Sequence, residues 1–190
     1  MAKRRTRSGL SRLRWKSPSN SPVGAWPRFA LVAVVAVLGL VMIRSFMRQD
    51  DWVKWSQALE RQAAGFTWPR WNPDWPPLPP SRTPHADVTG PYAFAATHSR
   101  DLRYIPCFCG CGRQRHESNA DCYLKAVTPG GRPTWDDHSF TCTTCVEVTR
   151  EVALMTKMGR PLREIRREIE AHHSGPSTPT PQVPTGDMTT

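Results

Sequence analysis

The stretch Pro106-Cys107-Phe108-Cys109-Gly110-Cys111-Gly112 places three cysteines at alternate positions, and all six cysteines of the chain fall between Pro106 and Cys145. Two cysteines separated by one residue close a very small disulfide ring, which fits poorly with the usual Cα separation and dihedral angle of a disulfide. The three sulfurs therefore need partners elsewhere in the chain. Those partners are either other cysteines or a soft metal ion.

The expected folded unit is a small Cys/His-rich domain over residues 92–173. A domain of about 80 residues buries a smaller share of its surface than a large one and often relies on disulfides or metal. After the last cysteine, helical periodicity predicts a helix over Thr143–Met158 that ends at Gly159, and a second helix that starts near Pro161. The inward stripe of this second helix is Leu162, Ile165, Arg166 and Ile169. The predicted fold class is mainly α.

Basic residues concentrate at the N-terminus. The formal net charge is +10, and residues 1–28 contain eight Lys and Arg residues and no Asp or Glu. The rest of the chain is close to neutral, whereas a nucleic-acid-binding domain carries a basic patch on its surface. We therefore expect no nucleic-acid partner.

An apolar segment follows the basic one. The fifteen residues of Phe29–Ile43 are uncharged and apolar. With their apolar neighbours they reach about 20 residues, enough for a helix to cross the hydrocarbon core. We predict a transmembrane signal anchor over residues 29–48, in contact with membrane lipid. A cleaved signal peptide has similar charged and apolar regions, but residues 43–48 contain no small-x-small cleavage site. The positive-inside rule places residues 1–28 in the cytoplasm and the cysteines outside.

Three further segments surround the domain. Residues 49–66 have apolar residues at helical spacing, which predicts a short helix that lies at the membrane interface, continues the anchor or packs on the domain. Residues 67–91 form a Pro/Trp-rich linker, whose prolines favour an extended, semi-rigid stalk. Its tryptophans are an alternative docking surface. Residues 174–190 are rich in Ser, Thr and Pro, which predicts a disordered tail.

Three explanations compete for the cysteines. The candidate metal ligands are Cys107, Cys109, Cys111, Cys122, Cys142 and Cys145, with His116 and His138 as further candidates. Closely spaced thiolates suit copper(I), a soft cation that accepts two or three sulfurs. A structural zinc site remains open, although the first cysteines lack the usual two-residue spacing. Disulfides are available to an exported domain and would make it an envelope interaction module without metal.

No catalytic arrangement is evident in the sequence. Cys142-Thr143-Thr144-Cys145 opens a predicted helix, whose dipole lowers the pKa of a thiol. No thioredoxin-like alternation of strands and helices precedes it, however. Since no Ser/His/Asp set, carboxylate pair or phosphate-binding loop is visible either, we do not expect an enzyme. Asp136 and Asp137 are candidates to orient His138 as residues behind a ligand. The alternative is that one of them only caps a turn.

Ordered features beyond the cysteines carry a family resemblance. They are Pro106 to Gly112, His116, Ser118-Asn119, Asp121-Cys122, Trp135-Asp136, His138, Cys142-x-x-Cys145, Gly159, Ile165-Arg166 and Ile169. Together they resemble the PCYCGC motif-containing (lipo)protein family over roughly Tyr104 to Ala171. Phe108 replaces the tyrosine of the motif, and a membrane helix stands where many relatives carry a lipid-modified cysteine. The resemblance implies an exported, membrane-tethered domain and little about activity.

From this location, a copper site would deliver or buffer copper for a membrane or envelope protein partner. The sequence thus predicts a single-pass membrane protein with its N-terminus in the cytoplasm. Its small Cys/His-rich helical domain is predicted to lie outside the membrane on a Pro-rich stalk.

Overall fold

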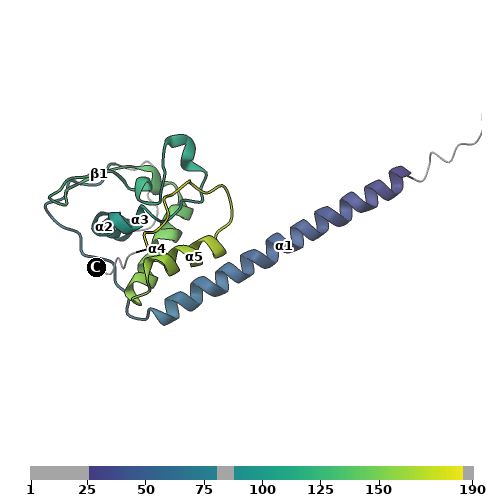
Figure 1. The fold of residues 1–190 in the computed structure, drawn as a ribbon, viewed down its shortest axis with the longest axis horizontal. Coiled ribbons are helices and arrows are strands. Elements are labelled where there is room, and N and C mark those ends of the chain that lie inside the picture. Colours follow the sequence, from purple (N-terminus) through teal and green to yellow (C-terminus); the bar gives the residue numbers. More distant parts are fainter. Residues whose placement is uncertain (1–25, 81–87, 186–190) are drawn as a thin grey trace, which may run out of the picture. The chain divides into compact units, whose positions relative to one another are not determined.

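The computed structural model describes residues 26–80 and 88–185, which are mostly helical. The chain divides into two units, Met1–Ser45 and Phe46–Thr190, whose boundary falls inside the first helix. Predictions for residues 1–25, 81–87 and 186–190, including most of the basic segment, lie outside the described residues. In chain order the elements are α1 (Trp26–Gln62), α2 (Thr89–Thr97), α3 (Ser99–Leu102), η1 (Cys111–Gln114), η2 (Ala120–Cys122), β1 (Leu124–Val127), β2 (Pro133–Trp135), η3 (His138–Phe140), α4 (Thr143–Lys157) and α5 (Leu162–His172) (Figure 1).

Helix α1 is continuous over 37 residues, so the anchor at 29–48 and the short helix at 49–66 are not separate elements. After Pro27 the helix contains no proline, and every backbone donor beyond the first turn can therefore join the helical hydrogen bonds. Within the first unit, its large apolar side chains are exposed; Phe29 is 73% and Val41 53% exposed. By length and composition, α1 is able to cross a membrane.

The later part of α1 belongs to the second unit and packs on the domain. Leu59 is buried in the domain core, as is Ala63 directly after the helix. Trp55 stacks on His172 of α5, with ring centroids 4.1 Å apart. Residues 49–66 thus continue the helix of the expected anchor and also pack on the domain, two of the three arrangements considered for them.

Helices α2, α4 and α5 form the core of the second unit. Helix α4 packs against both α2 and α5. Val152 and Met155 of α4 are fully buried, and Ile165 and Ile169 of α5 point inward, as the periodicity predicted. Gly159, with φ of +70°, lies just after α4, where a left-handed residue commonly ends a helix. Helix α4 therefore begins and ends close to its predicted bounds, and α5 begins close to its predicted start.

A small antiparallel hairpin, β1–β2, was not predicted from the sequence. Leu124 pairs with Trp135 and Val127 with Pro133, and the register is irregular between Leu124 and Ala126. Next to the Leu124–Trp135 pair, at the open end of the hairpin, the Asp136 amide donates to the Tyr123 carbonyl at 2.8 Å. Because Cys122 comes just before β1 and His138 just after β2, the hairpin returns these two candidate ligands to the same end of the domain.

The Pro/Trp-rich segment differs from the predicted stalk. In its described part, Trp71 and Trp75 lie against Trp135, with ring centroids 5.3 Å and 5.9 Å away. The Trp135 indole also donates to the Pro76 carbonyl at 2.9 Å. Prolines do prevent regular helix here, but burial of the large indole surfaces holds the segment on the domain. The prediction of a spacer is therefore corrected for residues 67–80.

The described part of the tail, residues 174–185, also packs on the domain, where disorder was predicted. Thr178 and Thr180 are buried. The Thr178 amide donates to the Cys107 carbonyl at 3.0 Å. Arg166, which is itself buried, donates to the carbonyls of Thr180 and Pro181. A segment of low hydrophobicity is thus ordered by hydrogen bonds to distant residues, which composition alone does not reveal.

Candidate metal centre

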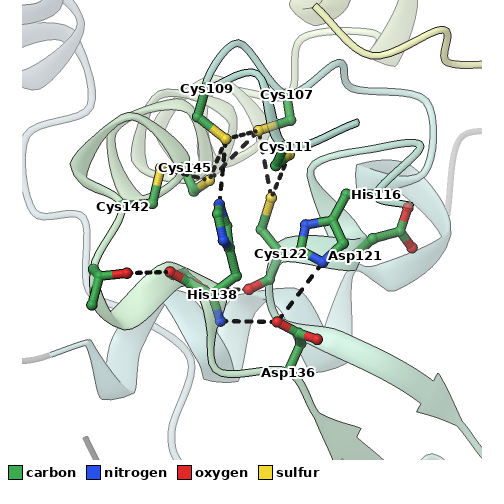
Figure 2. Close-up of polar contacts among 12 residues, drawn as sticks. Cys107, Cys109, Cys111, His116, Asp121, Cys122, Asp136, His138, Cys142 and Cys145 are labelled. Carbon is green, nitrogen blue, oxygen red and sulfur yellow. Dashed lines mark hydrogen bonds and ion pairs between the residues drawn. The ribbon is translucent and has the colours of Figure 1, made fainter. Parts of the chain in front are cut away.

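Three segments of the second unit bring the predicted site residues together (Figure 2). The first three site residues come from residues 106–112, which we call the motif loop. The next two come from the loop and η2 before β1, and the last three from η3 and the start of α4. In chain order they are Cys107, Cys109, Cys111, His116, Cys122, His138, Cys142 and Cys145. They form four overlapping groups, each with ligand atoms within 4.8 Å of one another. All eight thus lie in one cluster, and their role as ligands stays a prediction.

A turn at Gly110 shapes the motif loop. Gly110 has φ of +74°, a conformation that glycine adopts without a steric penalty, and it directly precedes η1. A side chain here would also meet the tail, because a Cβ would lie 3.3 Å from Cγ of Pro176. The turn gathers the sulfurs of Cys107, Cys109 and Cys111 into one of the four groups. Thus three sulfurs from alternate positions converge.

The sulfurs are close without being bonded. The Sγ–Sγ distances are 3.1 Å for Cys107–Cys109, 3.5 Å for Cys107–Cys145, 3.5 Å for Cys107–Cys122, 3.7 Å for Cys109–Cys145, 3.9 Å for Cys111–Cys122 and 3.1 Å for Cys142–Cys145. None of the six cysteines forms a disulfide in this structure. Two sulfurs that bind one ion tetrahedrally at about 2.3 Å lie about 3.8 Å apart. Small movements of these side chains would therefore suffice to hold an ion.

Buried hydrogen bonds fix the backbone behind the sulfurs. Ser139 Oγ donates to the Cys122 carbonyl at 2.6 Å, and the Tyr123 hydroxyl donates to the Cys145 carbonyl at 2.9 Å. Asn119 Oδ1 accepts from the Thr149 hydroxyl at 2.6 Å. Satisfied polar networks of this kind rigidify a core. Sequence reasoning did not assign roles to these residues, since only the fold brings them next to the cysteines.

His138 faces the cysteines from η3. Its Nε2 lies 3.3 Å from Cys109 Sγ. Its backbone amide donates to Asp136 Oδ1 at 2.9 Å, so Asp136 holds the start of η3. This contact is that of an aspartate that caps a turn, the alternative considered for Asp136 and Asp137, and the orientation of the His138 ring by an aspartate stays a prediction. Asp137 is exposed.

His116 is buried, and one of its nitrogens lacks a partner. Its Nε2 lies 3.9 Å from Asp136 Oδ1. Its Nδ1 is buried and is the only such side-chain nitrogen or oxygen in the described part of the chain without a hydrogen bond. Leaving a buried polar atom unpaired costs about 1–3 kcal/mol. Since His116 forms a ligand group with Cys111 and Cys122, a metal ion at this position would satisfy it.

Hydrogen bonds within the cluster separate the pKa values of its members. The bond from Cys122 lowers the pKa of Cys107 and raises that of Cys122 itself. The bond from Cys145 lowers the pKa of Cys142 to about 4. The bond between Cys142 and His138 raises the pKa of His138 to about 9. Without a metal, the cluster therefore favours thiolates at Cys107 and Cys142 beside a protonated imidazole. A metal ion would take the place of such protons.

A second buried polar group adjoins the motif loop. Glu151 of α4 is 2% exposed and accepts a hydrogen bond from the Trp52 indole of α1 at 3.0 Å. Its other oxygen pairs with His173. The His173 ring stacks on Phe108, with ring centroids 5.5 Å apart. His173 lies outside the cysteine cluster, and the sequence did not reveal that it links α1 and α4 to the motif loop.

A comparison with protein families matches residues 82–185 to a family described as a protein of unknown function with PCYCGC motif. This match covers more than half of the chain. The chain belongs to the PCYCGC motif family. The match confirms the resemblance. It also extends past both ends of the range Tyr104 to Ala171, because it includes the tail that contacts Cys107. Comparisons with curated proteins and with solved structures found no match.

The one departure from the PCYCGC motif lies at the surface of the cluster. Phe108 occupies the tyrosine position, is half-buried and contacts His173 through its ring. In this member of the family, the position therefore contributes ring packing and no hydroxyl. The sulfurs of the motif are all present.

Proposed function

We propose that this PCYCGC protein is a membrane-anchored, extracytoplasmic metal-binding protein that holds copper(I) through its Cys/His cluster. The observation that carries the proposal is the convergence of six free thiols and two imidazoles in one place. Buried thiols without a ligand gain little from such crowding, and closely spaced thiolates repel one another when they ionise. A bound cation removes this repulsion.

The donor set favours copper(I) over zinc. Six of the eight candidate atoms are sulfurs, and soft thiolates select copper(I), which accepts two or three of them. Zinc is held in structural sites by four ligands in tetrahedral geometry, commonly from pairs with two-residue spacing. Only Cys142 and Cys145 have that spacing. Zinc is therefore the alternative metal.

Access to the cluster supports a role in copper delivery or buffering. Cys107, Cys122 and Cys145 are buried, whereas Cys109 and Cys142 are partly exposed. A thiol of a partner protein can approach the partly exposed pair and replace one ligand at a time. We therefore propose that a membrane or envelope protein exchanges copper with the cluster from this side, without a chemical reaction on the chain itself.

The membrane location rests on α1 and on the charge pattern. Large exposed apolar side chains from Phe29 to Met47 are stable in hydrocarbon and costly in water. Eight basic residues precede them, which favours a cytoplasmic N-terminus. On this topology the second unit lies outside the membrane. The orientation is tested in intact spheroplasts that carry a tag at either end of the chain. Added protease should remove the C-terminal tag and leave the N-terminal tag intact.

The metal proposal is tested by competition for copper(I). The full chain, reduced and kept without oxygen in detergent micelles, is titrated against a coloured copper(I) chelator. We expect tight binding, and at least tenfold weaker binding after Cys109→Ser. His98→Asn is the control, because His98 stacks on Phe94 away from the cluster. Failure of the reduced chain to compete with the chelator would overturn the copper proposal, and competition for zinc alone would favour the structural zinc alternative.

A further inference from the structure

The cluster contains more donor atoms than one ion can use. Copper(I) takes two or three sulfurs, and zinc takes four ligands. The described residues offer eight donors, each within 4.8 Å of at least two others. The surplus raises the question of whether the donors surround one position or two.

Two of the groups of mutually close donors lie at different ends of the cluster. One contains Cys109, His138, Cys142 and Cys145, and we call it the sulfur end. The other contains Cys111, His116, Cys122 and His138, and we call it the histidine end. Cys142 belongs only to the sulfur end and His116 only to the histidine end, so no group unites these two residues.

The unpaired nitrogen of His116 marks the histidine end as a ligand position in its own right. A single ion at the sulfur end would leave Nδ1 of His116 buried and unpaired. Nε2 of the same ring faces Asp136 Oδ1 at 3.9 Å, a charge contact that is too long for a hydrogen bond. The histidine end therefore has a buried imidazole with one unpaired nitrogen, next to the thiols of Cys111 and Cys122.

A thiolate is the donor that can connect the two ends through a single atom. His138 belongs to both ends, but each ring nitrogen has one lone pair and binds one ion. Cys107 is fully buried between the ends, and its Sγ lies 3.5 Å from the sulfurs of both Cys122 and Cys145. A thiolate has several lone pairs and can bind two ions at once.

We propose that the cluster binds two copper(I) ions, one at each end, bridged by the thiolate of Cys107. This inference rests on the proposed metal-binding function and adds its stoichiometry and internal order. Together with the Cys107 bridge, each ion then has three sulfurs: the ion at the sulfur end takes Cys109 and Cys142, next to Cys145, and the ion at the histidine end takes Cys111 and Cys122 beside His116. Ligating thiols release their protons to solvent. The sulfur end is the more exposed, so its ion exchanges first with a partner.

Native mass spectrometry of the reduced full chain, released from detergent micelles after titration with copper(I), tests the proposal. We expect two ions on the wild-type chain. Cys142→Ser should keep the ion at the histidine end and bind the ion at the sulfur end at least tenfold more weakly. His116→Asn should show the opposite pattern. Cys107→Ser should weaken both ions. The control His98→Asn should retain two.

Other stoichiometries overturn the proposal. One ion on the wild-type chain, or three or more, contradicts a two-ion cluster but leaves the metal-binding function standing. No ion contradicts both. Circular dichroism shows whether each variant keeps its helices. Should a variant unfold, X-ray absorption of the wild-type chain loaded with two equivalents decides the matter: copper–copper scattering is expected, and its absence contradicts the thiolate bridge.

Discussion

Replacing Thr178 with valine tests whether the tail packs on the motif loop. Thr178 Oγ1 accepts a hydrogen bond from the Cys107 amide at 3.0 Å, and both residues are buried. Valine keeps the shape of threonine but offers no acceptor. The Cys107 N–H would then be buried without a partner, which costs about 1–3 kcal/mol. The free energy of unfolding of Thr178→Val should fall by this amount.

Urea unfolding of the full chain in detergent micelles, followed by tryptophan fluorescence, measures the loss. The midpoint should move to lower urea while the slope stays the same, because the surface exposed on unfolding is nearly unchanged. Thr178→Ser keeps the hydroxyl and should unfold close to the wild type. The neighbouring exposed residue supplies a second control, Ser177→Ala. If Thr178→Val unfolds at the wild-type midpoint, the tail does not hold Cys107 and our description of it is wrong.

Three further changes have expected outcomes. Asp136→Ala removes the acceptor that fixes His138 and faces His116, and should weaken copper(I) binding about 10–100-fold in the chelator competition; unchanged affinity would mean that Asp136 does not orient the ligands. Trp75→Ala loses two aromatic pairs and should lower stability by about 1–3 kcal/mol, whereas a free stalk would show no change. Burial raises the pKa of Tyr92 above its ordinary value. Its stabilising effect is therefore complete below about pH 10 and lost as pH rises further. Between about pH 9 and pH 11, the urea midpoint of Tyr92→Phe should therefore drop less than that of the wild type. An equal drop would mean that ionisation of the Tyr92 hydroxyl does not destabilise the fold.

Local sequence patterns predicted α4 and α5 well, whereas α2 was not predicted and begins inside the segment assigned to the linker. Ile165 and Ile169 follow the 3.6-residue period and are buried, and Gly159 marks the end of α4. Such signals depend on neighbours along the chain, which the sequence contains directly. The composition of residues 67–80 and of the tail was misleading, because it reflects only neighbours along the chain. Their order comes from distant partners such as Trp135 and Arg166, and composition carries no record of these contacts.

The members of the candidate site were predictable, but not their arrangement. The spacing of the cysteines identified the cluster because all eight donors lie within a short stretch that begins at Cys107. Which donors share an end depends on the hairpin β1–β2 and on the turn at Gly110. The unpaired Nδ1 of His116 is likewise a property of the fold, since it depends on what surrounds the ring.

We expect the cysteines to be reduced and, with the histidines, to hold metal. The most direct test isolates the full chain from membranes under non-reducing conditions and measures its intact mass, its thiol content after chelation and its metal content. We expect stoichiometric copper and six free thiols once the metal is removed. Six oxidised cysteines without metal would contradict the account and favour a disulfide-stabilised interaction module.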